Sequence, residues 1–170
     1  MIQTAYVKEN KSKDQIKQEL NTLEIQLFRM RENIKEIAKK WEMISIDQTS
    51  DFNWVVIYAD KRSEACQLML HDCDEPFRGE WHAAIQADYK GENTIHIADI
   101  KGKTNSGYGT ILMRHLKELA RDKNVQYITG DIVERDFDHV NRLKYFYRKH
   151  NFDVKIDHEE QCGGIVWYEG

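Results

Sequence analysis

Beyond residue 94, runs typical of strands alternate with runs typical of helices, and this alternation limits the fold more than any other feature. The expected elements are a strand at 94–100, a helix at 107–122, a strand at 125–133, a helix at 137–150, and strands at 152–156 and 165–169. A strand that is followed by a helix and another strand favours parallel pairing within one sheet. We therefore expect a mixed α/β sheet with some parallel pairing in its middle.

A meander of strands is expected upstream of this region. Runs rich in β-branched or aromatic residues occupy 53–60, 64–70, 80–89 and 94–100. Short polar turns at 60–63 and 90–93 separate neighbouring runs, and the longer gap around Pro76, the only proline, is expected to be a loop. Turns this short connect antiparallel strands. The sheet as a whole is therefore predicted to be twisted and largely antiparallel, in an α/β (α+β) fold with helices on its faces.

The N-terminal part of the sequence has the apolar spacing of a coiled-coil helix. Apolar residues alternate in steps of four and three at Ile16, Leu20, Leu23, Leu27, Met30, Ile34, Ile37, Trp41 and Ile44. A helix over 13–44 measures roughly 48 Å, whereas a domain of this size is about 30–40 Å across. We expect a helical, coiled-coil-like segment at 1–48 and a second domain at 49–170.

Two arrangements of this long helix remain open. Self-association through 13–44 would bury the apolar seam between copies of the chain. Alternatively, a bent helix, or two helices, could pack the seam wholly onto the chain's own domain. The flanking positions, among them Glu19, Glu24 and Arg31, do not pair cleanly in a parallel register. The sequence therefore leaves the orientation of paired helices undecided.

Composition excludes several classes of protein. The chain has 170 residues, of which 41% are hydrophobic and 32% charged, as in a soluble globular protein. No apolar run approaches the roughly 20 residues of a membrane span. The net charge of −4 offers no electrostatic footprint for nucleic acid. Three cysteines without a CxxC pair predict neither a disulfide framework nor a zinc site. We expect a cytoplasmic protein with reduced thiols and no bound metal.

The stretch "TNSGYGTILMRHLKELA" at 104–120 places two glycines at the expected start of a helix. Main-chain N–H groups at a helix start lack partners and attract anions, and glycines let a phosphate approach them closely. A P-loop would need Lys and Ser or Thr after Gly109, where Thr110 and Ile111 stand. A dinucleotide fingerprint would need a third small residue where Leu112 stands. The alternative is a tight turn between strand and helix that binds no ligand.

At this point the sequence resembles a known family. The ordered set "TIHIADIKGKTNSGYGTILMRHLKELA…VQYITGDIV…NRLKYFYRKHNFDVKI" looks like the acyl-CoA-binding half of the GNAT-superfamily N-acyltransferases. It spans 94–156, more than a third of the chain. Thr104 stands where the family prefers Gln or Arg, and Asn151 where Gly usually ends the helix. Asn is the commonest substitute for Gly in a left-handed helix cap, so its physical role is kept.

The resemblance implies acetyl-CoA, or another acyl-CoA, as co-substrate. It places the pyrophosphate on main-chain N–H groups at about 105–110, and the pantetheine along the edge of strand 94–100. The cofactor-binding residues that it implies are Ile100, Asn105, Ser106, Gly107, Tyr108, Gly109, Thr110 and Asn141.

The resemblance also suggests catalytic residues. Tyr147 stands at the position of the family's usual general acid, and a phenol with a pKa near 10 is protonated at neutral pH. Asp99, at the end of the strand before the loop, is the candidate general base; its alternative role is to cap that loop. Weaker candidates are Glu134, Asp136, His82, His96 and His139. A metal site of His71, Cys66 and Cys73 fits no standard ligand spacing.

The favoured function is therefore transfer of an acetyl or other acyl group from acetyl-CoA to a primary amine, whose identity the sequence does not indicate. Polyamines, aminoglycosides, protein amines and modified nucleosides all remain open as acceptors. One alternative is a non-catalytic acyl-CoA-binding module whose coiled-coil helix contacts a partner. Another is a coiled-coil interaction protein in which the α/β part is only a cap.

Overall fold

The computed structural model describes residues 10–60 and 64–170. Within these residues the strands form one eight-stranded sheet in the order β1-β2-β3-β4-β5-β6-β8-β7. Neighbours are antiparallel except β5 and β6, which are parallel. The strands are β1 Glu42–Gln48, β2 Trp54–Ala59, β3 Cys66–Asp72, β4 Ala83–Lys90, β5 Thr94–Gly102, β6 Tyr127–Ile132, β7 Asp153–Asp157 and β8 Cys162–Tyr168. The predicted fold class is confirmed.

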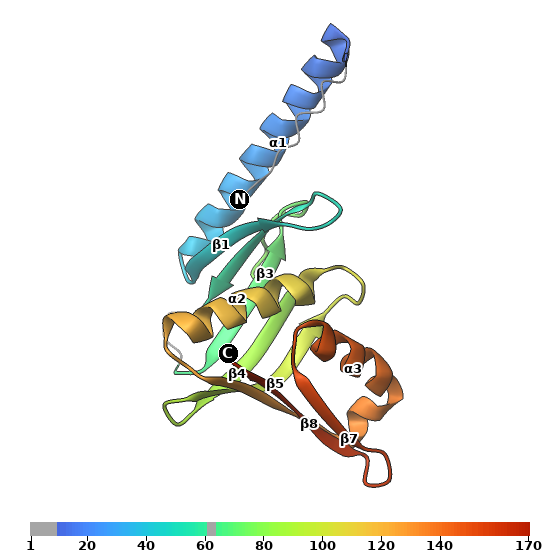
Figure 1. Ribbon diagram of the computed structural model, residues 1–170. Coiled ribbons are helices and arrows are strands. Elements are labelled where there is room, and N and C mark those ends of the chain that lie inside the picture. Colours follow the sequence, from blue (N-terminus) through green and yellow to red (C-terminus); the bar gives the residue numbers. More distant parts are fainter. Residues whose placement is uncertain (1–9, 61–63) are drawn as a thin grey trace.

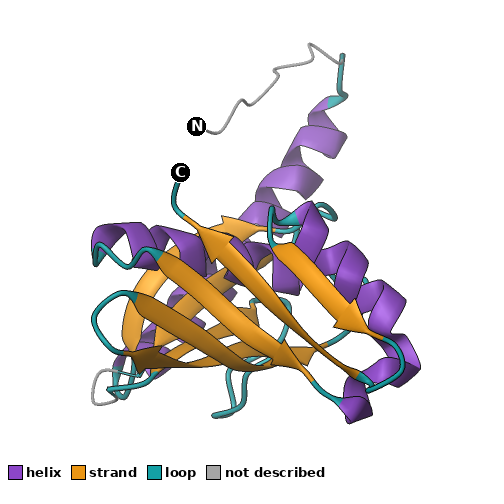
Figure 2. Cartoon of the chain, turned by 60° about the horizontal axis from the view of Figure 1, so that its bottom comes forward, coloured by secondary structure: helices purple, strands orange, loops and turns teal. Residues whose placement is uncertain are grey.

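Three α-helices and one 3₁₀ segment flank the described strands (Figures 1 and 2). They are α1 Lys13–Ala38, α2 Tyr108–Asp122, η1 Glu134–His139 and α3 Val140–Lys149. One core cluster joins one face of the sheet to α2 and α3, through residues such as Leu112, Leu116 and Tyr147. A second cluster lies on the opposite face, where Ile37 of α1 packs with Val56, Tyr58 and Met69. Helices thus cover both faces of the sheet.

The expected helix over 13–44 is wrong at its C-terminal end. A capping box between Ser12 and Gln15 starts α1, and the helix ends at Ala38. The segment "EMISIDQ" at 42–48 is strand β1, so the last three residues of the expected helix, 42–44, belong to the sheet. Trp41 and Ile44 continue the four-three spacing by coincidence, because an alternating strand pattern can share residues with a heptad.

Other differences from expectation are small. The expected helix over 137–150 begins with the 3₁₀ segment η1, where the carboxylate of Asp136 accepts a hydrogen bond from the Val133 amide at 2.9 Å. The expected turn at 60–63 falls mostly on residues 61–63, and the expected segment 1–48 begins with residues 1–9. Both stretches lie outside the described residues.

β1 has a β-bulge at Ile44, because Met43 pairs with Tyr58 and Ser45 with Ile57. Asp47 then accepts a hydrogen bond from Arg114, and its Oδ2 lies 3.2 Å from His115 Nε2. Burial acts to raise the pKa of Asp47, but the Gln48 amide, Arg114 and His115 outweigh it and hold the pKa below its usual value. These contacts tie the edge of the sheet to α2.

This tie should weaken in acid. Because folding lowers the pKa of Asp47, its contribution is present above the unfolded pKa of about 3.9 and is lost as the pH falls through the folded value. Asp47→Asn should lower the free energy of unfolding by about 0.5–1 kcal/mol at neutral pH, the scale of a surface pair, and by less near pH 3. Urea unfolding of the parent and the variant at both pH values measures this difference. An equal loss at both pH values would contradict the ion-pair account.

Candidate active site: a strand separation beside the start of a helix

β5 and β6 pair over only four residues and then separate. Their parallel ladder runs from Thr94 opposite Tyr127 to Ile97 opposite Gly130. Beyond that point β5 stays paired with β4 as far as Gly102, while β6 stays paired with β8. In the part of the chain that the structure describes, the facing edges of β5 and β6 are therefore not paired with each other beyond Ile97. Main-chain N–H and C=O groups on such an edge can bind an extended ligand.

A glycine stands at the last paired position of β6. A Cβ on Gly130 would lie 3.0 Å from the Ile165 Cδ1 atom and 3.4 Å from the Ile97 carbonyl oxygen. A side chain at this position would press on Ile165 of β8, so glycine suits the close packing of three strands where two of them part. The sequence interpretation overlooked Gly130, although a glycine inside the strand run "YITGDI" is a recognised sign of close backbone approach.

β5 also carries a bulge where it leaves β6. Asp99 pairs with Gln86 and Ile97 with Ala87, so Ala98 is the extra residue. A bulge bends its strand and increases the local twist. The candidate base Asp99 follows directly, half-buried, with its Oδ2 atom 3.5 Å from the Lys101 ammonium. Ile100 packs partly buried against the main core.

α2 begins close to the end of β5, after the loop that holds the candidate anion-binding residues. Its N-cap is Gly107 in the left-handed conformation, with a φ of 79°, and this residue has no side chain to cap the helix. The first helical bond runs from the Ile111 amide to the Gly107 carbonyl at 3.2 Å. The Tyr108 amide donates to Ser106 Oγ at 3.3 Å, so that amide already has an acceptor. The amides of Gly109 and Thr110 are the first-turn donors without a side-chain acceptor.

The loop before this helix start is held by its own contacts. The Ser106 hydroxyl donates to the Lys103 carbonyl at 2.7 Å, and Asn105 is left-handed with a φ of 57°. The first turn of α2 has no acidic residue. An anion placed here would meet the positive end of the helix dipole without a competing carboxylate on that turn.

Each glycine of the pair also has a reason within the fold. At Gly107 a Cβ would meet nothing within 4 Å, so its requirement is the left-handed backbone. At Gly109 a Cβ would lie 3.3 Å from the Phe146 Cε2 atom, so its requirement is close packing of α2 on α3. From the sequence we interpreted Gly107 and Gly109 as residues that let a ligand approach the backbone closely. The structure adds two local causes that hold without a ligand.

A buried carboxylate anchors the start of α2 to β3. The Tyr108 hydroxyl donates to Asp72 Oδ2 at 2.6 Å, and Asp72 is only 5% exposed. The same carboxylate accepts from the Asp74 amide at 3.0 Å. Burial raises the pKa of Tyr108, and the Asp72 bond and charge raise it further, so the phenol remains the donor. The first helical residue is thus fixed in place beside the candidate anion-binding amides.

Tyr108→Phe should lower the free energy of unfolding by about 1–3 kcal/mol, because a buried acceptor loses a donor. Urea unfolding measures this loss, and Tyr145→Phe provides a matched control, since Tyr145 is 70% exposed. The same loss in both variants would show that the hydrogen bond to Asp72 contributes nothing specific.

Tyr147 lies on α3 within the main core, at 8% exposure. Its ring centroid lies 5.3 Å from that of Phe152 and 5.4 Å from that of Phe146. Burial raises the pKa of its hydroxyl, and the nearby charges of Asp136 and Asp99 raise it further. The structure therefore brings the candidate acid and the candidate base within electrostatic range of each other.

The end of α3 fixes the position of Tyr147. The Phe152 amide donates to the Tyr147 carbonyl and the Asn151 amide to the Arg148 carbonyl, both at 3.0 Å. Asn151 has a φ of 61°. These two bonds and the contact between the Phe152 and Tyr147 rings form a Schellman cap. Asn151 thus occupies the left-handed position that the sequence assigned to it.

The remaining candidates lie elsewhere or already have partners. Asn141 is exposed, on the first turn of α3, and its side chain lies about 120° around the helix axis from that of Tyr147, so the two residues lie on different faces of the helix. His96 Nδ1 lies 2.9 Å from Thr129 Oγ1, and His82 Nδ1 accepts from the Asp72 amide at 3.0 Å. Glu134 is exposed, Asp136 caps η1, and His139 ends that segment.

The thiols and His71 do not form a metal site in the described residues, where no group of three or more His, Cys, Asp or Glu side chains could hold an ion. Burial raises the pKa values of Cys66 and Cys73 to about 11, so both remain protonated. His71 Nε2 lies 2.8 Å from the Glu75 carbonyl. Cys66 packs in the main core cluster, whereas Cys73 belongs to the second cluster and His71 packs against Phe77 of the loop after β3.

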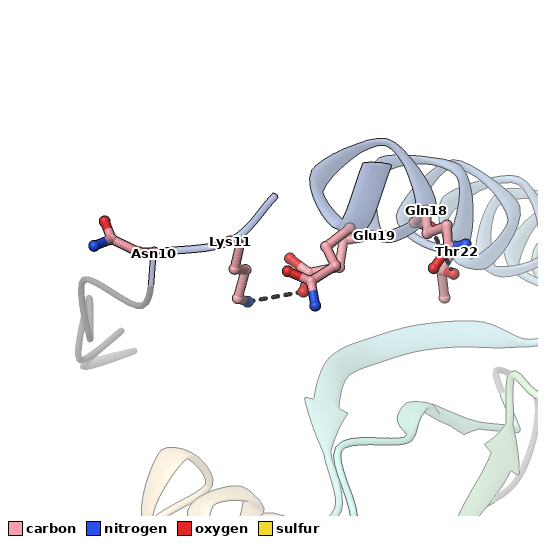
Figure 3. Close-up of a pocket in the computed structure, with 6 residues that line it drawn as sticks. Asn10, Lys11, Gln18, Glu19 and Thr22 are labelled. Atoms are coloured by element: carbon pink, nitrogen blue, oxygen red, sulfur yellow. Dashed lines mark hydrogen bonds and ion pairs between the residues drawn. The ribbon is translucent and has the colours of Figure 1, made fainter. Parts of the chain in front are cut away.

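Two surface hollows lie away from this site. One is lined by Asn10, Lys11, Gln15, Gln18, Glu19 and Thr22, around the first turns of α1 (Figure 3). The other is lined by Gln126, Tyr127, Tyr168 and Glu169. Neither contains a candidate residue, so the candidate site is defined by the strand separation and the start of α2.

No family model matches the chain. Among the described residues, no helix is long and apolar enough to cross a membrane. A GNAT family acetyltransferase from Elizabethkingia anophelis, solved with acetyl-CoA bound, has 12% identity and a TM-score of 0.48, over 62% of this chain and 77% of that one. The N-acetyltransferase PseH of Campylobacter jejuni has 14% identity and a TM-score of 0.48, over 65% of this chain and 72% of that one.

A relative by sequence is the uncharacterized protein YocC of Bacillus subtilis (strain 168). It is 44% identical over 159 residues, which cover 94% of this chain and 96% of that protein. At this identity and over nearly the full length of both chains, the chain belongs to the same family as YocC.

Proposed function

We propose that this protein transfers an acyl group from acetyl-CoA, or another acyl-CoA, to an amine. One observation carries the proposal: β5 and β6 separate beyond Ile97 and Gly130, close to a helix start whose N-cap residue, Gly107, has no side chain to cap it. An extended, anionic ligand such as coenzyme A needs both features, an unpaired strand edge and a positive helix terminus.

The residues present fit such a ligand. The amides of Gly109 and Thr110 would hold the pyrophosphate, with Asn105, Ser106 and Gly107 shaping the loop around it. Gly107 has open space where a side chain would stand. The edge of β5 from Ala98 to Lys101 would bond the pantetheine arm as an added strand does.

Acyl transfer from a thioester to an amine requires two proton transfers that side chains could carry out. A C–N bond forms as the C–S bond of the thioester breaks, one proton leaves the amine, and one reaches the sulfur. Tyr147 would protonate the sulfur, because its raised pKa keeps its proton in place throughout the neutral range. Asp99 would accept the proton of the amine. Main-chain N–H groups near the bulge at Ala98 would stabilise the negative charge that develops on the carbonyl oxygen.

The experiment is a thiol-release assay. The full-length chain is incubated with acetyl-CoA and, in turn, with polyamines, aminoglycosides, peptides bearing free amines, and modified nucleosides. The proposal predicts release of the free thiol, above the rate without amine, with at least one of these classes. Saturable binding of acetyl-CoA without thiol release would favour the non-catalytic acyl-CoA-binding module. No binding at all would favour the coiled-coil interaction protein.

A further inference from the structure

α1 is covered by the chain's own domain at one end only. Ile37 is fully buried, and Ile34 and Met30 pack partly buried on the second core cluster. Toward the N-terminus the helix extends beyond the sheet, as Figure 1 shows. The apolar seam continues there at Ile16, Leu20, Leu23 and Leu27, which are 47%, 55%, 56% and 63% exposed.

The first turns of this projecting part also carry polar side chains. Gln18, Glu19 and Thr22 line a hollow there, and the Lys11 ammonium lies 2.8 Å from Glu19 Oε1 (Figure 3). An amphipathic helix with no domain beneath its apolar seam needs a partner, because a long bare apolar stripe is unfavourable in water.

We propose that this seam pairs with the same seam of a second copy of the chain, with the two helices antiparallel. In an antiparallel pair the a position of one helix packs against the d position of the other. The register that we infer places Ile16 against the partner's Leu27 and Leu20 against the partner's Leu23, and the twofold axis repeats both contacts. These contacts would bury the four seam residues that the domain does not cover. Ile34 and Ile37 would remain packed against the sheet of their own chain.

The charges beside the seam distinguish the two orientations. In this antiparallel register Lys17 lies opposite the partner's Glu24, and symmetry gives two such attractive pairs. A parallel pair would instead place Glu19 opposite the partner's Glu24, which gives two repulsive pairs. The proposal narrows the expected self-association from 13–44 to the projecting part of α1, and it stands independently of the proposed function.

The test reverses each of the two charges separately and then exchanges them in one double variant. Sedimentation equilibrium of the full-length chain at micromolar concentrations measures the dissociation constant of the dimer. The parent should be a dimer. Glu24→Lys and Lys17→Glu should each raise the dimer dissociation constant roughly tenfold, because two attractive pairs become repulsive. The double variant Lys17→Glu with Glu24→Lys should return to the affinity of the parent. Helix content from circular dichroism confirms that each variant is folded.

The other outcomes overturn the proposal. A monomeric parent would mean that the seam does not pair with a second copy of the chain. A tighter dimer in Glu24→Lys would indicate parallel helices, and no effect of either reversal would mean that Lys17 and Glu24 are not opposed. Leu23→Asp with Leu27→Asp should give a monomer that still binds acetyl-CoA. A dimer in that variant would place the interface elsewhere.

Discussion

Tyr147→Phe is expected to lower the turnover of amine acylation about 100-fold, the usual scale for a lost general acid. The hydroxyl is the only group that the substitution removes, and the ring contacts with Phe146 and Phe152 remain. The affinity for acetyl-CoA should change little. Steady-state kinetics with the amine that gives the fastest thiol release, together with a binding titration, separate the two quantities.

Tyr145→Phe is the matched control, because Tyr145 lies on the same helix but is exposed. Its turnover should equal that of the parent. Since burial and the charges of Asp136 and Asp99 raise the pKa of Tyr147, the loss in Tyr147→Phe should be similar from about pH 6 to about pH 9. Unchanged turnover of Tyr147→Phe across that range would show that the hydroxyl is structural.

Gly107→Asp should weaken binding of acetyl-CoA about 100-fold relative to Gly107→Asn. The two variants have side chains of almost the same shape in an open position, and Asn and Asp tolerate a positive φ better than most residues. They differ by one negative charge, which would repel a pyrophosphate at the start of α2 by about 2–3 kcal/mol at short range. Isothermal titration calorimetry measures both affinities.

If Gly107→Asn and Gly107→Asp bind acetyl-CoA with equal affinity, the pyrophosphate does not bind beside Gly107. Gly109, the other glycine of the pair, is less suitable for this test. A side chain there would press on Phe146, at 3.3 Å from its Cε2 atom, and would therefore disturb the packing of α2 on α3 as well as any ligand.

Elements with strong local signals could be predicted from the sequence. The meander from β2 to β5, the helix after the glycine pair, and the parallel pairing of β5 with β6 were all expected. So was the left-handed Asn151, because few residues other than Gly and Asn end a helix in that conformation. The strands, the helix and the left-handed cap follow from residues that are neighbours along the chain, and the parallel pairing follows from the strand–helix–strand order.

β1 could not be recognised from the sequence, because this region fits both the four-three spacing of a helix and the alternation of a strand. Trp41 and Ile44 continue the four-three spacing of α1, while Met43, Ser45 and Asp47 alternate as an edge strand does. The choice between helix and strand depends on pairing with β2, which lies across a turn. Local spacing gives no information about that pairing.

The details of the candidate site depend on contacts between residues far apart in the sequence. Tyr108 and Asp72 are 36 residues apart, and Gly109 and Phe146 meet only because α2 packs on α3. The separation of β5 from β6 depends on where β8 pairs with β6. A motif located the start of α2, but these contacts explain why the strand edge and the helix start lie together.

The central claim is that the strand separation and the start of α2 form an acyl-CoA site. The most direct measurement is a calorimetric titration of the unmodified full-length chain with acetyl-CoA. The account predicts saturable binding of one acetyl-CoA per chain, weakened by Gly107→Asp and retained by Tyr147→Phe. Absence of saturable binding, or binding that Gly107→Asp leaves unchanged, would contradict it.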